Sequence, residues 1–496
     1  MEKRTLYWLI AITLLTVALR ITLAFLIPNL TYDSYFHLRQ VEHITQTGMP
    51  LYHDELSYGG RDILFLPLFH YFAALFALFL PLELVAKLLP NLLLATLPFL
   101  VFLLSKKITN EDTPSLISAF IAGFLPIFYS TNRFSPDALF FPLILFTLYC
   151  FLHLSEKKYL YLYLTSFILL SLTSSATVFL LLGMGIYILL AFLENKSVRS
   201  EEKEVLLFSL FAFLWIQVLF FKKIFLNAGI SFIWQNVPSS LLQQYFPKVS
   251  ILSALILVSI IPFLAGIWVV YRSLFQSPHR KVLLLISLVL ATTFLSWLQL
   301  VRFEFSLAFF SLILAILFAS FYQQLQEYLQ RTKFPKFHHY LLPLTIVLLL
   351  LTLLPPALST TWKQQTPVPD EIQAFLWLRE NTPKEAGILA LLEEGHLVTY
   401  YSQRHNLMDD QFSRIDDIDQ RFQDLNSFYT TRFQTQALKL LDQYQLQYLV
   451  LTPAAASKYS TSNFNFLGGE CFKKIYSNET KIYLVKCSLK EQETPK

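Results

Sequence analysis

The chain has 496 residues, of which 55% are hydrophobic and only 15% are charged. So apolar a composition excludes an ordinary soluble protein of several domains and indicates a membrane protein. The formal net charge of +5 is spread over the loops, so it gives no sign of nucleic-acid binding, and three cysteines are too few for a disulfide scaffold.

The first predicted element is a membrane span over residues 7–27. Lys3 and Arg4 precede it, which places the N-terminus in the cytoplasm, and no small-residue cleavage site follows it. The stretch from Thr31 to Phe72 therefore emerges outside. It holds acids, histidines and arginines among aromatics. A polar segment that dense beside a membrane indicates chemistry, although an ordinary external loop remains an alternative.

The positions of Lys and Arg in the loops predict a polytopic α-helical protein with about eleven spans. An apolar run near 63–81, broken by Pro67 and His70, is predicted to be an interfacial or re-entrant helix outside. The spans are expected near 7–27, 84–104, 114–130, 137–154, 159–173, 176–193, 204–221, 250–271, 282–299, 305–322 and 340–358. Residues 1–359 would form this transmembrane domain.

Residues 360–496 are predicted to form a soluble, extracytoplasmic α/β domain. Apolar spacing predicts helices over 371–381 and 435–445, and the segments 387–392 and 448–451 are typical of buried strands. The segment 471–487 predicts a hairpin that turns at Asn478 and Glu479. Cys471 and Cys487 would end opposite each other there, which permits an extracellular disulfide.

This topology gathers five polar sites at the outer ends of spans. Carboxylates there can hold a divalent cation or act as a general base, whereas Arg and Lys can neutralise a lipid phosphate. The competing interpretation is that these side chains only mark the headgroup zone. The sites are Asp33 with His37 and Arg39, His70 with Glu83 and Lys87, Arg133 with Asp137, the loop from Lys222 to Lys248, and Arg302.

These residues resemble motifs of the GT-C membrane glycosyltransferases, in particular the catalytic subunit of archaeal oligosaccharyltransferase. YDSYFHLRQVEHITQTGMPLYHDELSYGGR is similar to the first external loop, with Asp33 at the first acidic motif. STNRFSPDALFFP resembles the second acidic motif and assigns Asp137 to its aspartate. VRF at 301–303 resembles the basic site for the donor diphosphate, which falls on Arg302, and residues 377–410 resemble the start of the soluble domain.

Three positions depart from that pattern. Leu139 stands where the second motif usually has an acid or a His, and Gln235 replaces a metal-binding Glu of the long external loop. Leu391, Leu392 and Glu393 stand at the tryptophan–tryptophan–aspartate motif that recognises the acceptor Ser or Thr. Mg²⁺ or Mn²⁺ at Asp33 and Asp137 is therefore in question, because Gln235 offers only a neutral carbonyl. Gln235 and Glu393 become candidate acceptor-binding residues.

The resemblance implies transfer of a sugar or oligosaccharide from a polyprenyl phosphate or diphosphate carrier to an extracytoplasmic acceptor, as in protein N-glycosylation. Asp33 and Asp137 would be catalytic, and Arg302, Lys87 and His70 would bind the donor phosphate. Two alternatives remain. One is a metal-independent transferase that uses a polyprenyl-phosphate monosaccharide on a lipid, glycan or protein hydroxyl, and the other is an inactive homologue or glycan-binding membrane protein.

Overall fold

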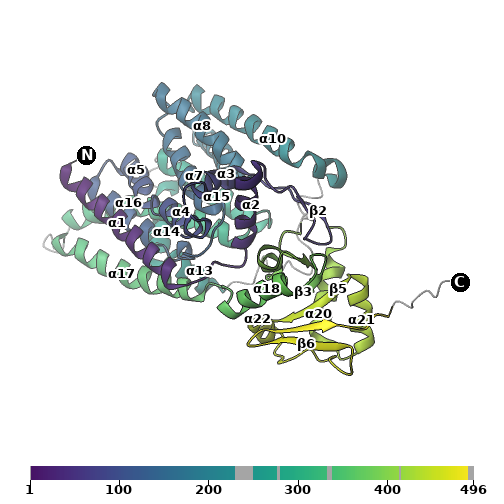
Figure 1. Ribbon diagram of the computed structural model, residues 1–496. Helices are drawn as coiled ribbons and strands as arrows, with labels where there is room; N and C mark the ends of the chain where they lie inside the picture. The colour runs from purple at the N-terminus through teal and green to yellow at the C-terminus, as the bar shows by residue number, and fades with distance from the viewer. Residues whose placement is uncertain (1, 230–249, 276–279, 332–337, 413–414, 490–496) are drawn as a thin grey trace. The chain divides into compact units, whose positions relative to one another are not determined.

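The computed structural model describes residues 2–229, 250–275, 280–331, 338–412 and 415–489 (Figure 1). Two compact units divide the described chain. The helical unit comprises the residues up to Pro28, those from Leu66 to 229, and those from 250 to Gln364. The sheet unit comprises Asn29–Phe65 and the described residues from Gln365 onwards, so the polar segment that follows α1 belongs to the same unit as the C-terminal segment.

The described part of the helical unit consists of α-helices joined by short loops, two of which contain a 3₁₀ turn, Pro126–Phe128 and Ser175–Thr177. The helices are α1 (Lys3–Leu26), α3 (Leu68–Ala77), α4 (Leu82–Leu94), α5 (Leu97–Thr109), α6 (Asp112–Phe124), α7 (Asp137–Phe151), α8 (Lys157–Thr173), α9 (Val178–Leu193), α10 (Ser200–Ala228), α13 (Ile251–Val258), α14 (Ile260–Phe275), α15 (Arg280–Trp297), α16 (Phe303–Arg331) and α17 (His338–Lys363).

Among the described residues, seven helical segments are long and apolar enough to cross a membrane, and an eighth results if α13 and α14, bent by 90°, form one span. The seven are Lys3–Leu26, Leu82–Thr109, Ser175–Leu193, Ser200–Leu226, Arg280–Trp297, Phe303–Arg331 and Tyr340–Lys363. The chain is a multi-pass membrane protein, as predicted, but the count of eleven spans is not confirmed. Three predicted spans correspond to α6, α7 and α8, whose 13, 15 and 17 residues fall short of the roughly 20 that a bilayer core requires.

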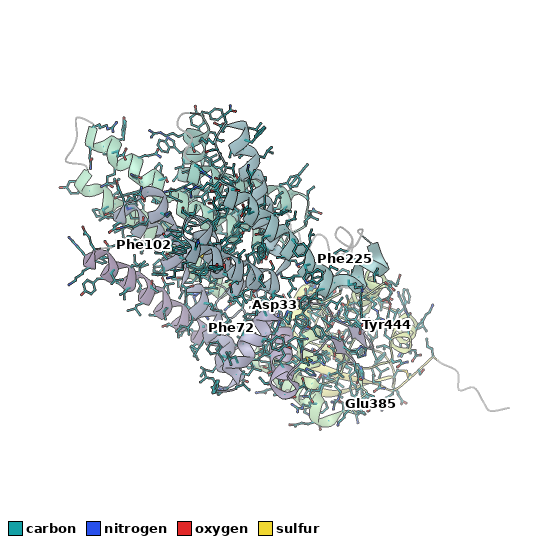
Figure 2. All side chains as sticks on the ribbon, turned by 90° about the horizontal axis from the view of Figure 1, so that it is seen from above. Asp33, Phe72, Phe102, Phe225, Glu385 and Tyr444 are labelled. Atoms are coloured by element: carbon teal, nitrogen blue, oxygen red, sulfur yellow. A yellow bond between two sulfur atoms is a disulfide. The ribbon has the colours of Figure 1, made fainter. Side chains whose placement is uncertain are left out.

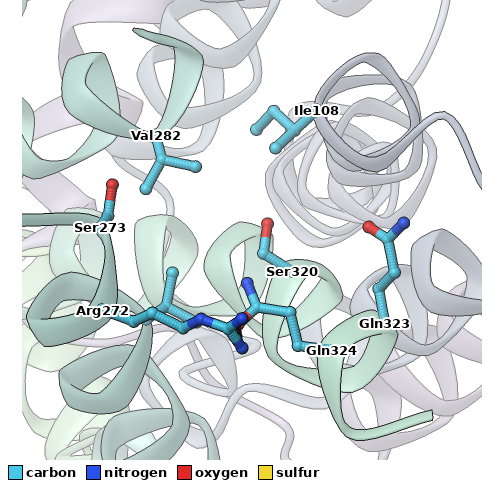
Figure 3. Close-up of a pocket in the computed structure, with 8 residues that line it drawn as sticks. Ile108, Arg272, Ser273, Val282, Ser320, Gln323 and Gln324 are labelled. Atoms are coloured by element: carbon cyan, nitrogen blue, oxygen red, sulfur yellow. Dashed lines mark hydrogen bonds between the residues drawn. The ribbon is translucent and has the colours of Figure 1, made fainter. Parts of the chain in front are cut away.

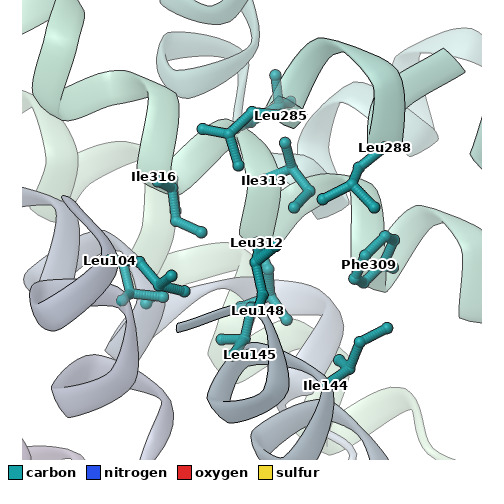
Figure 4. Packing of buried hydrophobic residues seen from close by; sticks show 14 of the residues in the cluster. Leu104, Ile144, Leu145, Leu148, Leu285, Leu288, Phe309, Leu312, Ile313 and Ile316 are labelled. Atoms are coloured by element: carbon teal, nitrogen blue, oxygen red, sulfur yellow. The ribbon is translucent and has the colours of Figure 1, made fainter. Parts of the chain in front are cut away.

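Helix α16 forms the centre of the helical unit, since 83% of its most apolar 18-residue stretch is buried inside the protein. Its small residues Ser311, Ala315 and Ala319 let neighbouring helices approach closely. Its large residues pack against α5, α7 and α15 (Figure 4). By contrast, only 22% of the corresponding stretch of α17 and 17% of that of α10 are buried, as expected of helices that face lipid.

The sheet unit is built on a mixed five-stranded sheet with the order β4-β3-β5-β7-β6. β3 (Gly387–Leu389) pairs in parallel with β4 (His405–Asn406) and β5 (Leu446–Leu451), and β7 (Lys481–Val485) runs antiparallel to β5 and β6 (Phe472–Ser477). The remaining elements are α2 (Ser34–Thr47), the hairpin of β1 (His53–Asp54) and β2 (Arg61–Asp62), α18 (Pro369–Asn381), α19 (Gly395–Leu397), the π-helix Val398–Ser402, α20 (Ile418–Thr430), α21 (Gln434–Gln443) and α22 (Pro453–Lys458).

The hairpin of β6 and β7 contains the disulfide that the sequence permits. Cys471 and Cys487 are bonded, with their Cα atoms 4.9 Å apart. The predicted helices and strands of the C-terminal segment also correspond to α18, α21, β3 and β5. The fold class, a polytopic helical protein with a C-terminal α/β domain, is confirmed.

Candidate functional site

Asp137 in the helical unit lies close to two arginines. It is the first residue of α7, where an acid interacts favourably with the helix dipole. Arg133, four residues earlier, has an Nη2 atom 3.7 Å from Asp137 Oδ2, and Arg302, directly before α16, has its Nη2 3.9 Å from the same oxygen. The structure thus brings Arg302, predicted as a separate polar site, to the predicted group of Arg133 and Asp137.

The exposure of these groups suits a site that receives an anion. The Asp137 side chain is 21% exposed, whereas the Arg302 side chain is 51% exposed. A guanidinium that is half exposed and lies beyond direct hydrogen-bond distance of its carboxylate still has N–H groups for a second partner. Its planar donors match the geometry of phosphate oxygens. The arrangement can hold a phosphate next to a carboxylate.

A buried asparagine fixes the loop that carries Arg133 and Asp137. Asn132 is fully buried, and its Nδ2 donates to the carbonyl oxygens of Ala24 at 3.1 Å and Ile27 at 3.0 Å. Its backbone N–H donates to Gln364 Oε1 at 3.3 Å, and Gln364 Nε2 donates back to Asn132 Oδ1 at 3.4 Å. Ile27 and Gln364 lie next to two of the points where the chain passes between units. Asn132 therefore holds the motif loop to both of these segments.

Lys87 and His70, the other two predicted ligands of the donor phosphate, lie in environments that differ from that of Arg302. Lys87 Nζ donates to the carbonyl oxygen of Ile27 at 3.0 Å and lies 5.4 Å from the centre of the Phe25 ring. Among the residues that the structure describes, no ion pair joins Lys87 to Asp137. His70 is on α3 with only 1% of its surface exposed. The structure brings Arg302 to Asp137 and uses Lys87 to hold the end of α1.

Asp33, the other predicted catalytic acid, belongs to the sheet unit and lies directly before α2 (Figure 2). Thr31 Oγ1 donates to Asp33 Oδ1 at 2.6 Å. The neighbouring Tyr32 hydroxyl donates to Glu371 Oε2 at 2.8 Å, so the start of this segment is fixed to α18. Burial, together with the charge of Glu371, raises the pKa of Tyr32, which therefore stays protonated and keeps donating.

Glu393 and Glu394, next to each other in sequence, have different environments. Glu393, the predicted acceptor-binding residue, is 27% exposed and pairs with Lys458 Nζ at 2.9 Å. Glu394 is fully buried, accepts hydrogen bonds from Thr452 Oγ1 and from the backbone N–H of Leu391, and has a pKa raised to about 8 by burial and by Glu371. The exposed carboxylate of Glu393 is the one that can meet an acceptor.

The sequence reasoning missed His396, Asp409 and Asp410. His396 Nε2 lies 2.6 Å from Asp410 Oδ1, and its Nδ1 lies 3.9 Å from Asp409 Oδ2. The only signal in the sequence was the adjacent pair of aspartates, because the histidine is brought in by the fold. Among the described residues, this is the group whose ligand atoms are close enough together to hold a metal.

The partners of Asp409 make a metal at this group a poor fit. Its Oδ1 accepts from Arg61 Nη2 and from the backbone N–H of Gln411, at 2.8 and 2.9 Å. Its Oδ2 accepts from Ser57 Oγ and Asn406 Nδ2, at 2.7 and 3.0 Å. A metal would have to displace these donors and approach a guanidinium. The same holds for Asp137, whose neighbours are two cations. Gln235 lies outside the described residues.

The fold is that of the GT-C membrane glycosyltransferases. Archaeal oligosaccharyltransferase AglB from Archaeoglobus fulgidus, solved with an inhibitory peptide and a dolichol-phosphate, has a TM-score of 0.73 at 14% identity, over 90% of this chain and 70% of that one. Its complex with Zn and sulfate has a TM-score of 0.60 at 14% identity, over 88% and 67%.

ArnT from Cupriavidus metallidurans, bound to undecaprenyl phosphate, has a TM-score of 0.56 at 11% identity, over 97% of this chain and 98% of that one. No protein-family model matches the sequence, and no curated protein matches it either. At these identities the likeness shows the fold and leaves activity to be argued from the residues.

Proposed function

We propose that this protein is a membrane glycosyltransferase that moves a sugar or oligosaccharide from a polyprenyl phosphate or diphosphate carrier to an extracytoplasmic acceptor. The observation that carries the proposal is Asp137 with Arg133 and Arg302 around it, at the ends of α7 and α16 in a GT-C fold. Protein N-glycosylation is the first acceptor chemistry that we propose, on the resemblance of the motifs.

In the proposed reaction, an acceptor nucleophile attacks the anomeric carbon of the donor sugar. The bond from that carbon to the carrier phosphate breaks, and the phosphate leaves with the electron pair. Asp137 and Asp33 position the acceptor and take its proton. Arg302 balances the charge of the leaving phosphate, which is worth most where water is excluded. Lys87 and His70 are proposed to assist at the donor, and Glu393 and Gln235 at the acceptor.

A second candidate function is favoured by two observations. Asp137 already has two cations beside it, so a divalent ion is less needed there than at an acidic cluster. The likeness to ArnT also extends over nearly the full length of both chains. We therefore keep as an alternative a metal-independent transfer from a polyprenyl-phosphate monosaccharide to a lipid, glycan or protein hydroxyl. An inactive homologue that only binds glycan is the outcome if neither transfer occurs.

The test is glycan transfer by the purified full-length protein in nanodiscs, with labelled carrier lipids from crude membranes and a sequon peptide as acceptor, in Mn²⁺ and in chelator. Labelled peptide that disappears with chelator supports a metal-dependent oligosaccharyltransferase. Label that reaches a lipid or glycan and survives chelator supports the alternative. If no transfer to any acceptor occurs, the remaining candidate is an inactive homologue that only binds glycan.

The variants Asp33→Asn and Asp137→Asn should each abolish transfer in this assay. Asp112→Asn is the matched control, because Asp112 also begins a helix of the helical unit and pairs with a cation, Lys106. It lies at the start of α6, about 20 Å of helix before the loop that leads to Asp137. Full activity in Asp137→Asn would contradict the proposed role.

A further inference from the structure

A second polar site exists in the helical unit, away from Asp137. A cavity of about 90 Å³ lies between α5, α14, α15 and α16 (Figure 3). Its volume is about three times the roughly 30 Å³ that one water occupies in the liquid, so a small polar group fits. The lining residues are Ile108, Val269, Arg272, Ser273, Val282, Ser320, Gln323 and Gln324.

The cavity lies about one membrane thickness from Arg302. Helix α16 begins directly after Arg302 and carries Gln323 near its other end. These two residues are 21 positions apart, which on a helix corresponds to about 32 Å. The hydrocarbon core of a bilayer is about 30 Å thick. If Arg302 is level with the headgroups of one leaflet, the cavity is level with those of the other.

Arg272 gives the cavity a fixed positive charge. Its Nη1 donates to Gln324 Oε1 at 2.8 Å, and its guanidinium lies 5.4 Å from the centre of the Trp268 ring. These contacts hold the guanidinium in place, while its other N–H groups remain available. A pre-positioned guanidinium binds an anion at a lower entropic cost than a free side chain does.

The other polar groups of the cavity are hydroxyls and amides, and none of its lining residues is acidic. Ser273 is 6% exposed, and its buried hydroxyl has no hydrogen-bond partner among the described residues. Ser320 is 7% exposed, and Figure 3 shows its hydroxyl beside the open space between the helices. A buried hydroxyl without a partner is costly, so a ligand that accepts its hydrogen bond would be stabilised.

Two acids near this end of the bundle, Asp112 and Glu202, pair with Lys106 and Arg280, and a third, Glu111, accepts from Gln323 Nε2 at 3.2 Å. Among the residues that line the cavity, the charged group is Arg272, which favours an anion over a cation. The apolar wall of Ile108, Val269 and Val282 suits the aliphatic part of a lipid.

We propose that this cavity binds the phosphate of an anionic membrane lipid in the leaflet opposite Asp137 and Arg302. Arg272 would donate to the phosphate oxygens, with Ser273 and Ser320 as further donors. The predicted orientation makes this the cytoplasmic leaflet. The site takes no part in the proposed transfer, and its test needs no activity.

Native mass spectrometry of the full-length protein in detergent tests the proposal, with phosphatidic acid, phosphatidylglycerol and phosphatidylcholine of matched chains. The first bound lipid should be one of the two anionic lipids. Arg272→Gln should weaken its binding about 10- to 100-fold, since hydrogen bonds to a charged group contribute about 1.5–3 kcal/mol. Arg199→Gln is the matched control, because it removes the same charge from an exposed loop residue that contacts Ser155.

Ser320→Leu provides a second variant, which fills the cavity and leaves Arg272 unchanged. It should also remove the preference for anionic lipid, and thermal unfolding of both variants checks that they fold. Displacement of phosphatidic acid by inorganic phosphate, lost in Arg272→Gln, would support recognition of the phosphate itself. If inorganic phosphate binds but no lipid binds in a way that depends on Arg272, the ligand of the cavity is free phosphate and the proposal of a lipid is overturned. Equal binding of phosphatidylcholine, or equal lipid binding by both variants and the wild type, would overturn the proposal.

Discussion

Asn132 combines hydrogen bonds to two distant parts of the helical unit, the end of α1 and Gln364 after α17, and its substitution should affect both stability and activity. We predict that Asn132→Asp destabilises the protein by about 2–4 kcal/mol, because the carboxylate cannot donate to the carbonyl oxygens of Ala24 and Ile27 and its charge is buried. Transfer activity should fall as well, since the loop also carries Arg133 and Asp137. Thermal unfolding and the transfer assay measure the two effects.

The control for this substitution is Asn381→Asp, at an exposed asparagine that ends α18. It should change neither readout. A variant at Asn132 that unfolds as the wild type does and transfers at the full rate would show that the loop needs no such anchor.

The raised pKa of His396 predicts that the stability of the protein decreases as the pH rises. Burial would lower its pKa, but Asp409 and Asp410 outweigh burial and raise the pKa, with Arg61 as the opposing charge. The protonated ring thus stabilises the fold below about pH 6.5, and this contribution is lost as the pH rises through the folded-state pKa. Glu394, with a pKa raised to about 8, acts in the same direction between about pH 4.3 and 8.

The measurement is the unfolding temperature of the full-length protein between pH 6 and 9. His396→Gln should flatten the dependence in part, and His43→Gln, at a partly buried histidine of α2, is the control. At low pH the lowered pKa of Asp409 acts in the opposite sense, because its contribution is lost as the pH falls through the folded-state pKa. A wild-type protein whose stability rises from pH 6 to 9 would contradict this account.

The candidate site residues that the sequence points to are those that each belong to a short, recognisable motif. Asp137 and Arg302 were identified from short segments, and the structure brings them together. Asn132 could not be identified in this way, because its partners Ala24, Ile27 and Gln364 lie between 105 and 232 positions away. Backbone carbonyls carry no sequence signal, so a side chain that binds them is found only in the fold.

At the scale of elements, the hairpin of β6 and β7 was predictable because alternation, a turn and two cysteines all indicated it. The bond between Cys471 and Cys487 closes a loop with a sequence separation of 16. We predict that the double variant Cys471→Ser/Cys487→Ser unfolds with about 3 kcal/mol less stability, as the chain-entropy model gives for a loop of about 15 residues. Chemical denaturation in detergent measures the difference.

Reducing agent supplies the control for the disulfide. It should lower the stability of the wild type to that of the double variant and leave the variant unchanged. Reduction that affects both equally would assign the effect to another cause.

Other elements escaped prediction for physical reasons. β4 has only two residues, and the π-helix Val398–Ser402 has no periodicity of its own, so tertiary contacts determine both. The apolar runs 114–130 and 137–154 were predicted as spans, yet helices α6 and α7 end at Phe124 and Phe151. Apolar length in sequence overestimates these two helices, because the end of each run forms turns, among them the 3₁₀ turn Pro126–Phe128.

At the scale of the whole molecule, the candidate residues fall in two compact units. Asp137 and Arg302 are in the helical unit, and Asp33 and Glu393 are in the sheet unit. All four were proposed as candidates from the sequence, but the sequence did not reveal that the segment Asn29–Phe65 belongs with the C-terminal residues. That grouping depends on contacts such as Arg61 to Asp409, 348 positions apart.

The proposed roles of Arg302 at the donor and Glu393 at the acceptor predict that the two Michaelis constants respond to different substitutions. Arg302→Gln should raise the KM for the carrier lipid about 10-fold or more, because a cation facing a phosphate is lost, and should leave the KM for the acceptor unchanged. Glu393→Gln should do the reverse, since Glu393 pairs with Lys458 in the sheet unit. Steady-state kinetics with each substrate varied in turn measures both. Lys458→Gln is the companion variant, and it should follow Glu393→Gln if the pair reads the acceptor. An increase of both constants in each variant would mean that Arg302 and Glu393 do not act on separate substrates.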